Sequence, residues 1–203
     1  MAYRNMESSS SEGNGTEARG RSRVNAGMFL RTVPERLRAK TRSAINQYRV
    51  MRSEIQEQRA YVHEYEGDHN GSVNLYLKAY KNIYSLGDRQ RENMLLLRAS
   101  MEMHAHGDEL VGRAGLWGNC QDRTDMLIDA YIKYSHAIIL KGRIDRTAYR
   151  AVQLRLLQSC DDAIYEASVS YIDYSNNGKY CDPPPKLVVA RKSLEVLRKN
   201  FGV

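Results

Sequence analysis

The chain of 203 residues is poor in residues that cross-link or interrupt a fold, with three cysteines and four prolines. The three thiols, Cys120, Cys160 and Cys181, are too few and too scattered for a disulfide framework or a zinc module, so we expect a reducing compartment. No apolar run approaches the roughly 18 residues of a membrane-spanning helix, and the N-terminus lacks a signal-peptide core. These absences argue against a disulfide-rich scaffold and a membrane-spanning protein, and predict a soluble chain.

Strand patterns and internal repeats are also lacking. Apolar residues instead recur at spacings of three and four, which is typical of amphipathic helices. The sequence therefore predicts an all-α fold, a multi-helix bundle of about six helices. Their expected ranges are 34–67, 73–87, 88–108, 120–140, 145–171 and 187–201.

Local signals set the expected helix boundaries. Asp88 and Asp145 stand where N-terminal caps are preferred. Turn-forming residues predict a turn at 68–72 and a glycine-rich loop at 112–118, and Gly142 is expected to end the helix at 120–140. The first helix should carry an apolar stripe with the spacing of a helix face, formed by Leu37, Thr41, Ala44, Tyr48, Met51, Ile55 and Val62.

Residues 1–30 have the composition of a disordered, basic and serine-rich tail, whereas residues 31–203 form the predicted helical domain. The net charge is +7, and residues 1–60 hold twelve Arg or Lys against six Asp or Glu, which accounts for +6 of it. The tail fits a linker, a basic contact arm or a secretion signal. The basic N-terminal part fits a surface for nucleic acid or acidic partners, or simply a solvated helix face.

One octet, Gly118-Asn119-Cys120-Gln121-Asp122-Arg123-Thr124-Asp125, combines a nucleophile, two carboxylates and a fixed cation. A cysteine in the first turn of a helix faces unpaired backbone N–H groups and the positive end of the helix dipole, which favour thiolate. Polar neighbours argue that Cys120 is exposed, as a nucleophile must be. Cys160 and Cys181 instead fit ordinary structural cysteines.

Metal binding and cofactors are not expected. His104, His106 and Asp108 have a suggestive spacing, but two residues along a helix turn the side chain by about 200°, so the imidazoles point apart. A polar helix end is the better interpretation of this segment.

The run Cys120-Gln121-Asp122-Arg123, entering a helix, resembles the Cys-x-Asp signature of the bacterial NEL-type ubiquitin ligases, a family of secreted effectors. The resemblance implies that Cys120 accepts ubiquitin from a conjugating enzyme as a thioester and passes it to a lysine of a host protein. It implies that Asp122 serves the attacking amine, that the protein acts in the host cell cytoplasm after bacterial secretion, and that nucleic acid is not its target. Arg123 and Asp125 are expected to support the site, Arg123 by pairing with a carboxylate and Asp125 by compensating the helix dipole.

Two other functions remain open. A protease- or transglutaminase-like thiol enzyme would need a histidine beside the thiol, and His136 lies sixteen residues farther along the same predicted helix, roughly 24 Å away. A phosphatase loop is excluded because Arg123 is only three residues from Cys120. A non-enzymatic basic helical adaptor, binding a host protein or nucleic acid through residues 19–60, is the second alternative.

Overall fold

The computed structural model describes residues 35–116, 120–145, 147–176 and 183–203. The predicted tail at 1–30, Trp117 to Asn119 and Cys181 lie outside the described residues. The chain divides into two compact units, Met1–Arg42 and Ser43–Val203. Of the first unit only residues 35–42 are described, as the beginning of a helix.

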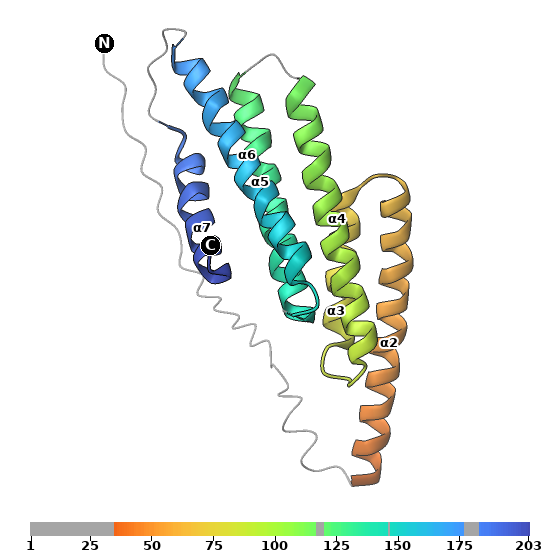
Figure 1. Ribbon diagram of the computed structural model, residues 1–203. Coiled ribbons are helices and arrows are strands. Elements are labelled where there is room, and N and C mark those ends of the chain that lie inside the picture. The colour runs from red at the N-terminus through yellow and green to blue at the C-terminus, as the bar shows by residue number, and fades with distance from the viewer. Residues whose placement is uncertain (1–34, 117–119, 146, 177–182) are drawn as a thin grey trace, which may run out of the picture. The chain divides into compact units, whose positions relative to one another are not determined.

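The described residues form six helices and no strand, which confirms the all-α prediction (Figure 1). The helices are α2 (Glu35–Tyr65), α3 (His69–Ile83), α4 (Arg89–Leu116), α5 (Cys120–Ile144), α6 (Arg150–Asn176) and α7 (Pro185–Phe201). Within the second unit, α4 to α7 run alternately up and down, and α5 contacts α4, α6 and α7.

Aspartates mark the helix starts. The backbone N–H of Arg91 donates to Asp88 Oδ1 at 3.1 Å, and the N–H groups of Thr147 and Ala148 donate to Asp145 Oδ1 at 2.7 and 3.0 Å. The cap predicted at Asp88 is therefore confirmed. Asp145 instead closes the turn before α6, because that helix begins only at Arg150. The predicted turn at 68–72 is wrong, because Asp68 caps α3 by accepting from the Gly71 N–H at 2.9 Å and the helix starts at once.

Two glycine-based boundaries are also wrong. Helix α4 continues from the predicted end at Asp108 through Gly112 to Leu116, and α5 continues through Gly142 to Ile144. Gly112 has open space around it, whereas two other positions, Gly107 and Gly142, lie where helices pack closely. A Cβ at Gly107 would lie 2.5 Å from the Tyr134 ring, and one at Gly142 would lie 3.0 Å from Gln153 Nε2, so α5 and α6 approach closely there.

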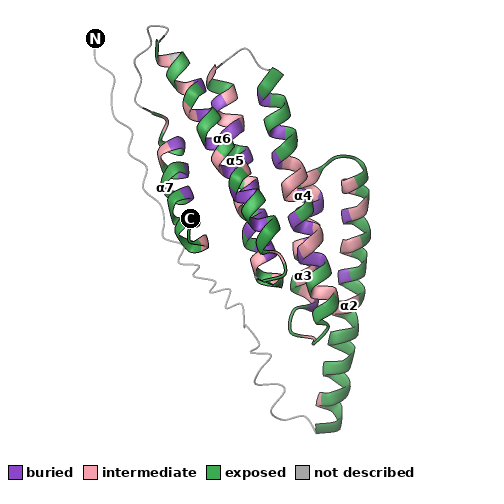
Figure 2. Ribbon diagram, in the orientation of Figure 1, coloured by how far each residue is buried: buried purple, intermediate pink, exposed green. Residues whose placement is uncertain are grey.

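Two hydrophobic clusters hold the second unit together, and they appear as the buried bands of Figure 2. The larger cluster joins α4, α5, α6 and α7 and includes Leu127, Ile128, Leu156 and Leu187. The smaller one joins α2, α3, α4 and α5 and includes Tyr76. Helix α2 buries only Ala60 in these clusters, and its half-buried Tyr61 packs against the smaller one.

Candidate functional site

Cys120 is the first residue of α5, as the sequence predicted. Two hydroxyl groups hold its backbone carbonyl: Thr124 Oγ1, one turn along, donates to it at 2.8 Å, and Ser170 Oγ on α6 donates at 3.2 Å. The second bond ties the start of α5 to α6. The position of the cysteine therefore depends on the packed bundle as well as on its own helix.

Cys120 is a free cysteine, and the residue is half-buried. The positive end of the helix dipole favours negative charge in this turn. Cys160, which is also free, has a different environment. It is fully buried, and burial raises the pKa of its thiol to about 12, so it stays protonated and packs as an apolar side chain.

The two carboxylates near Cys120 have different surroundings. Asp122 is exposed in the first turn, and Asp125 Oδ1 lies 3.8 Å from Lys186 Nζ on α7. Because Cys120 and Asp122 are two residues apart in a regular helix, their side chains leave it about 200° apart. Asp122 is thus directed away from the sulfur. Its carboxylate can contact a molecule bound at the thiol only if that molecule extends across the N-terminal end of the helix.

Arg123 joins α5 to α6. One of its terminal nitrogens (Nη2) donates to Glu166 Oε2 at 2.8 Å, while its buried Nε has no hydrogen-bond partner among the described residues. The arginine borders a cavity of about 350 Å³ whose lining also includes Val111, Ala114, Leu127, Tyr134, Ser159, Asp162 and Glu166. The Arg123 guanidinium therefore links α5 to α6 beside the cavity.

A histidine partner for the thiol is not provided by α5. The helix runs unbroken from Cys120 to Ile144, so His136 lies about 24 Å along it from Cys120, given a rise of about 1.5 Å per residue. Burial, followed by the charge of Lys133, lowers the pKa of His136. The geometry therefore argues against a papain- or transglutaminase-like pair made by these two residues.

The histidines of α4 point in different directions, as their spacing predicted. The His104 ring lies 5.8 Å from the Tyr134 ring on α5, whereas the His106 ring stacks on His69 of α3 at 5.7 Å. Within the described ranges, no group of three or more His, Cys, Asp or Glu residues could hold a metal ion.

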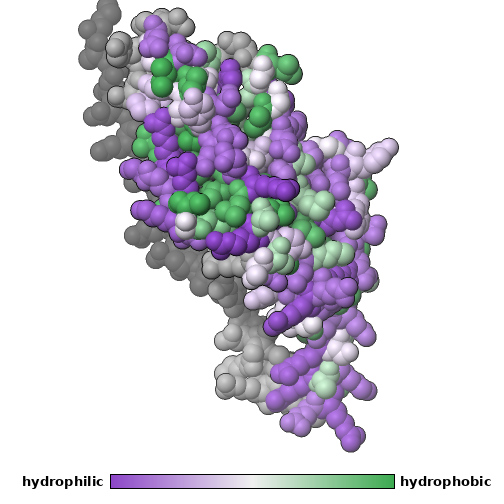
Figure 3. Space-filling model, viewed as in Figure 1, coloured by the Kyte–Doolittle hydropathy of each residue, from purple (hydrophilic) through white to green (hydrophobic). Residues whose placement is uncertain are grey.

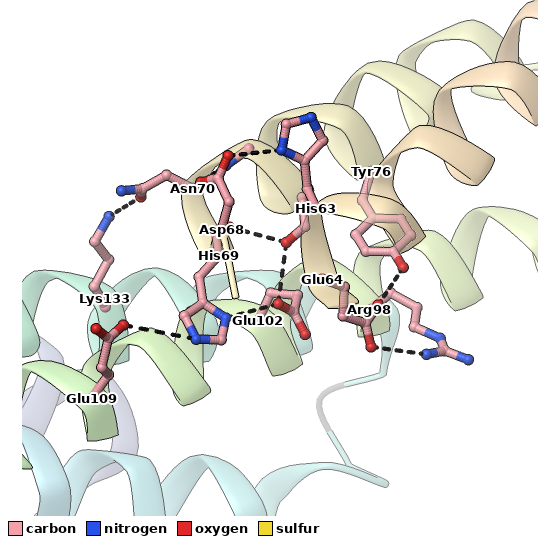
Figure 4. Close-up of polar contacts among 12 residues, drawn as sticks. His63, Glu64, Asp68, His69, Asn70, Tyr76, Arg98, Glu102, Glu109 and Lys133 are labelled. Atoms are coloured by element: carbon pink, nitrogen blue, oxygen red, sulfur yellow. Dashed lines mark hydrogen bonds and ion pairs between the residues drawn. The ribbon is translucent and has the colours of Figure 1, made fainter. Parts of the chain in front are cut away.

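A polar network between α3 and α4 was not anticipated from the sequence (Figure 4). Buried Glu102 accepts from His69 Nδ1 at 2.9 Å and from Ser72 Oγ at 3.1 Å. The other ring nitrogen of His69 lies 3.8 Å from Glu109, and Lys133 of α5 donates to Asn70 at 2.7 Å. None of these polar residues stands out in the sequence, so only the folded structure shows that their side chains contact one another.

Comparison with protein-family models, with curated protein sequences and with solved structures finds no match to this chain. Among the described residues, no helix has the length and apolar character needed to cross a membrane.

Proposed function

We propose that the chain is a cysteine-dependent ubiquitin ligase in which Cys120 carries ubiquitin as a thioester. The observation that carries the proposal is the free, half-buried thiol on the first residue of a 25-residue helix, anchored to α6 through Ser170. An accessible nucleophile in a fixed position at the positive end of a helix is what acyl transfer requires. The ubiquitin specificity rests on the resemblance of residues 120–123 to the Cys-x-Asp signature.

The reaction has two steps. The Cys120 thiolate attacks the carbonyl of the thioester between ubiquitin and a conjugating enzyme; a new C–S bond forms, and the thiolate of the conjugating enzyme leaves. The amine of a substrate lysine then attacks the Cys120 thioester, an amide forms, and the Cys120 thiolate is released.

Asp122 accepts the proton that the amine loses in the second step. Because its side chain leaves the helix about 200° from that of Cys120, Asp122 meets the incoming amine from the helix end and does not deprotonate the thiol. Arg123 and Asp125 act as supports, through Glu166 on α6 and Lys186 on α7. Secretion into a host cell is part of the same proposal and rests on the resemblance.

A non-enzymatic helical adaptor is the second candidate, and one observation favours it. Helix α2 exposes large apolar side chains, including Tyr48 and Ile55, next to several arginines. Such a surface suits a binding partner and needs no reactive thiol.

A charging assay with ubiquitin, activating enzyme and a panel of conjugating enzymes tests the ligase. We expect wild type to form a ubiquitin adduct that thiol reductant removes, and Cys120→Ala to form none. Cys160→Ala is the control, since that thiol is buried. Asp122→Asn should accumulate the adduct and slow its discharge to lysine, whereas Asp129→Asn, an exposed aspartate farther along α5, should behave as wild type.

Thiol labelling of the same variants separates the two candidates. A ligase needs Cys120 to react faster with iodoacetamide than a model peptide thiol, whereas an adaptor has no such need. Absence of an adduct with every conjugating enzyme, together with ordinary labelling, would leave the adaptor as the function.

A further inference from the structure

Helix α2 faces the bundle with a mostly polar side. Its fully buried residues are Ser53, whose Oγ donates to the Ala79 carbonyl at 3.1 Å, and Ala60. Around them Arg91 of α4 forms ion pairs with Glu54 and Glu57 at 3.3 and 3.1 Å.

Farther along the same side of α2, Glu64 accepts from Tyr76 of α3 at 2.6 Å and pairs with Arg98 of α4 at 3.5 Å (Figure 4). Small residues and ion pairs thus attach α2 to the rest of the unit, together with Tyr61, whose ring meets that of Tyr76 edge-on at 5.8 Å.

The apolar side of α2 points the opposite way. Ile55 follows buried Ser53 by two positions, and Val62 follows buried Ala60 by two, which places each about 200° around the helix. Tyr48, Met51, Ile55 and Val62 are 55, 51, 48 and 55% exposed. In Figure 2 most of α2 is exposed, and the intermediate and buried segments lie mainly in its upper half. The residues of this outer stripe are Ala44, Tyr48, Met51, Ile55 and Val62. They are exposed and belong to neither hydrophobic cluster of the described residues.

The face of the protein shown in Figure 3 is largely hydrophilic over α2, while hydrophobic side chains gather over other helices. Because the surface around it is hydrophilic, the apolar stripe of α2 is expected to be a specific contact area.

The spacing of the apolar residues along the stripe indicates what kind of partner binds it. Intervals of four and three alternate through 44, 48, 51, 55, 58 and 62, and the sequence continues the pattern back to Leu37 and Thr41. This is the a/d repeat of a coiled coil, with Gln58 as a polar d residue. A strict 3.5-residue period keeps the stripe facing a second helix along its whole length.

We propose that the chain forms a homodimer in which the α2 helices of two copies pair as a parallel coiled coil. Charged residues beside the apolar seam support the parallel orientation. Glu54 occupies a g position, and in a parallel pair it faces Arg59, which occupies the e position of the next heptad in the other copy. An antiparallel pair would instead bring e positions together, and Arg52 and Arg59 both occupy e.

The arrangement leaves room for both bundles. Asn46, Ser53 and Ala60 occupy the f positions, opposite the a/d seam, and Ser53 and Ala60 are the residues that α2 buries against its own bundle. Each copy therefore carries its bundle on the outer side of the coil.

The pairing is expected to be reversible. The 23 residues from Ser43 to Tyr65 span about 34 Å at about 1.5 Å per residue, and a helix is about 10 Å wide. Two such faces bury on the order of 700 Å², below the size of standard stable interfaces, so we expect a dissociation constant in the micromolar range. The helix is already formed in each copy, which lowers the entropy lost on pairing.

Sedimentation equilibrium of the full chain from submicromolar to several hundred micromolar tests the dimer. We expect a monomer–dimer equilibrium that Ile55→Glu weakens by at least tenfold without changing helical content or the urea midpoint, because the residue is exposed. Val196→Glu on α7, where Val196 is 58% exposed, is the matched control and should dimerise as wild type. Cys120→Ala should also dimerise as wild type, so this test is independent of the ligase proposal.

Two further variants test the orientation. Arg59→Glu should weaken a parallel dimer, because it sets two carboxylates opposite each other at the g and e positions, and should strengthen an antiparallel one. Glu54 is left unchanged, because it also pairs with Arg91 of its own copy at 3.3 Å. Gln58→Cys, with Cys120 and Cys181 replaced by Ser, should form an interchain disulfide under mild oxidation only if the helices are parallel and in register. A monomer at all concentrations, or a dimer indifferent to Ile55→Glu, would overturn the proposal. A monomer that binds anionic vesicles or nucleic acid through the stripe would also overturn it and assign the surface to that partner.

Discussion

Gly107 shows how one absent side chain sets the spacing of two helices. A Cβ at this position would lie 2.5 Å from the Tyr134 ring, whose hydroxyl is fixed by donating to Asp108 Oδ1 at 2.8 Å. The ring therefore cannot move without losing that bond.

Substitution of Gly107 separates packing from helix propensity. Gly107→Ala should lower the free energy of unfolding by about 1–3 kcal/mol, because added volume in a filled space forces the helices apart. Gly112→Ala, on the same helix with open space around it, should raise the free energy by about 0.5–1 kcal/mol. Urea unfolding followed by circular dichroism measures both, and equal effects would contradict the close contact.

The candidate site was only partly predictable at the residue scale. Sequence reasoning placed Cys120 at a helix start, because capping and glycine signals are local. It could not supply Glu166, Ser170 or Lys186, which come from α6 and α7 and lie 43 to 61 residues from their partners in α5. Such contacts depend on how the helices pack, and polar residues in the sequence carry no signal of that packing.

Helix α2 should be the least stable element of the second unit. It buries Ser53 and Ala60, whereas α5 buries ten residues including Leu127 and Ile128. Its attachment through Arg91 and Arg98 depends on partly exposed ion pairs, which salt screens.

Native-state hydrogen exchange measures this difference. At low protein concentration the amides of residues 43–65 should exchange with a lower opening free energy than those of α5, and added salt should speed exchange in α2 more than in α5. Uniform protection along both helices would show that α2 unfolds only with the whole unit.

The sequence predicted that α2 exists and where its apolar stripe lies, but not which side meets the bundle. Burying an apolar stripe is the general expectation for a surface helix. Here the polar side is buried, because Ser53 and the acidic residues find specific partners on α3 and α4. The same reasoning explains the wrong end of α4: local signals mark glycine as a helix breaker, and tertiary packing overrides them.

For the whole molecule, buried groups that stay protonated make stability depend on alkaline pH. Burial raises the pKa of Cys160 from its ordinary 9.0 to about 12, and burial raises that of Tyr131 from 10.0 to about 12. The pKa of Tyr134 also rises, through burial and then through its bond to Asp108. All three residues belong to the larger cluster, so their titration is coupled to unfolding of the unit.

The sign of the dependence follows from proton linkage. Above about pH 9 the unfolded chain loses these protons while the folded chain keeps them, so the unfolded state binds fewer protons and stability falls as pH rises. The stabilising contribution is complete below about pH 9 and is lost as the pH passes through about 12. We expect the urea midpoint to be steady from neutral pH to about pH 9 and to fall steadily above it.

Tyr131→Phe should make the fall above about pH 10 less steep, since phenylalanine does not titrate. Tyr165→Phe, at a site 70% exposed, is the control and should leave the slope unchanged. A midpoint that stays constant to about pH 11 would mean that these groups are hydrated in the folded protein, and the close packing of α4, α5 and α6 would then be wrong.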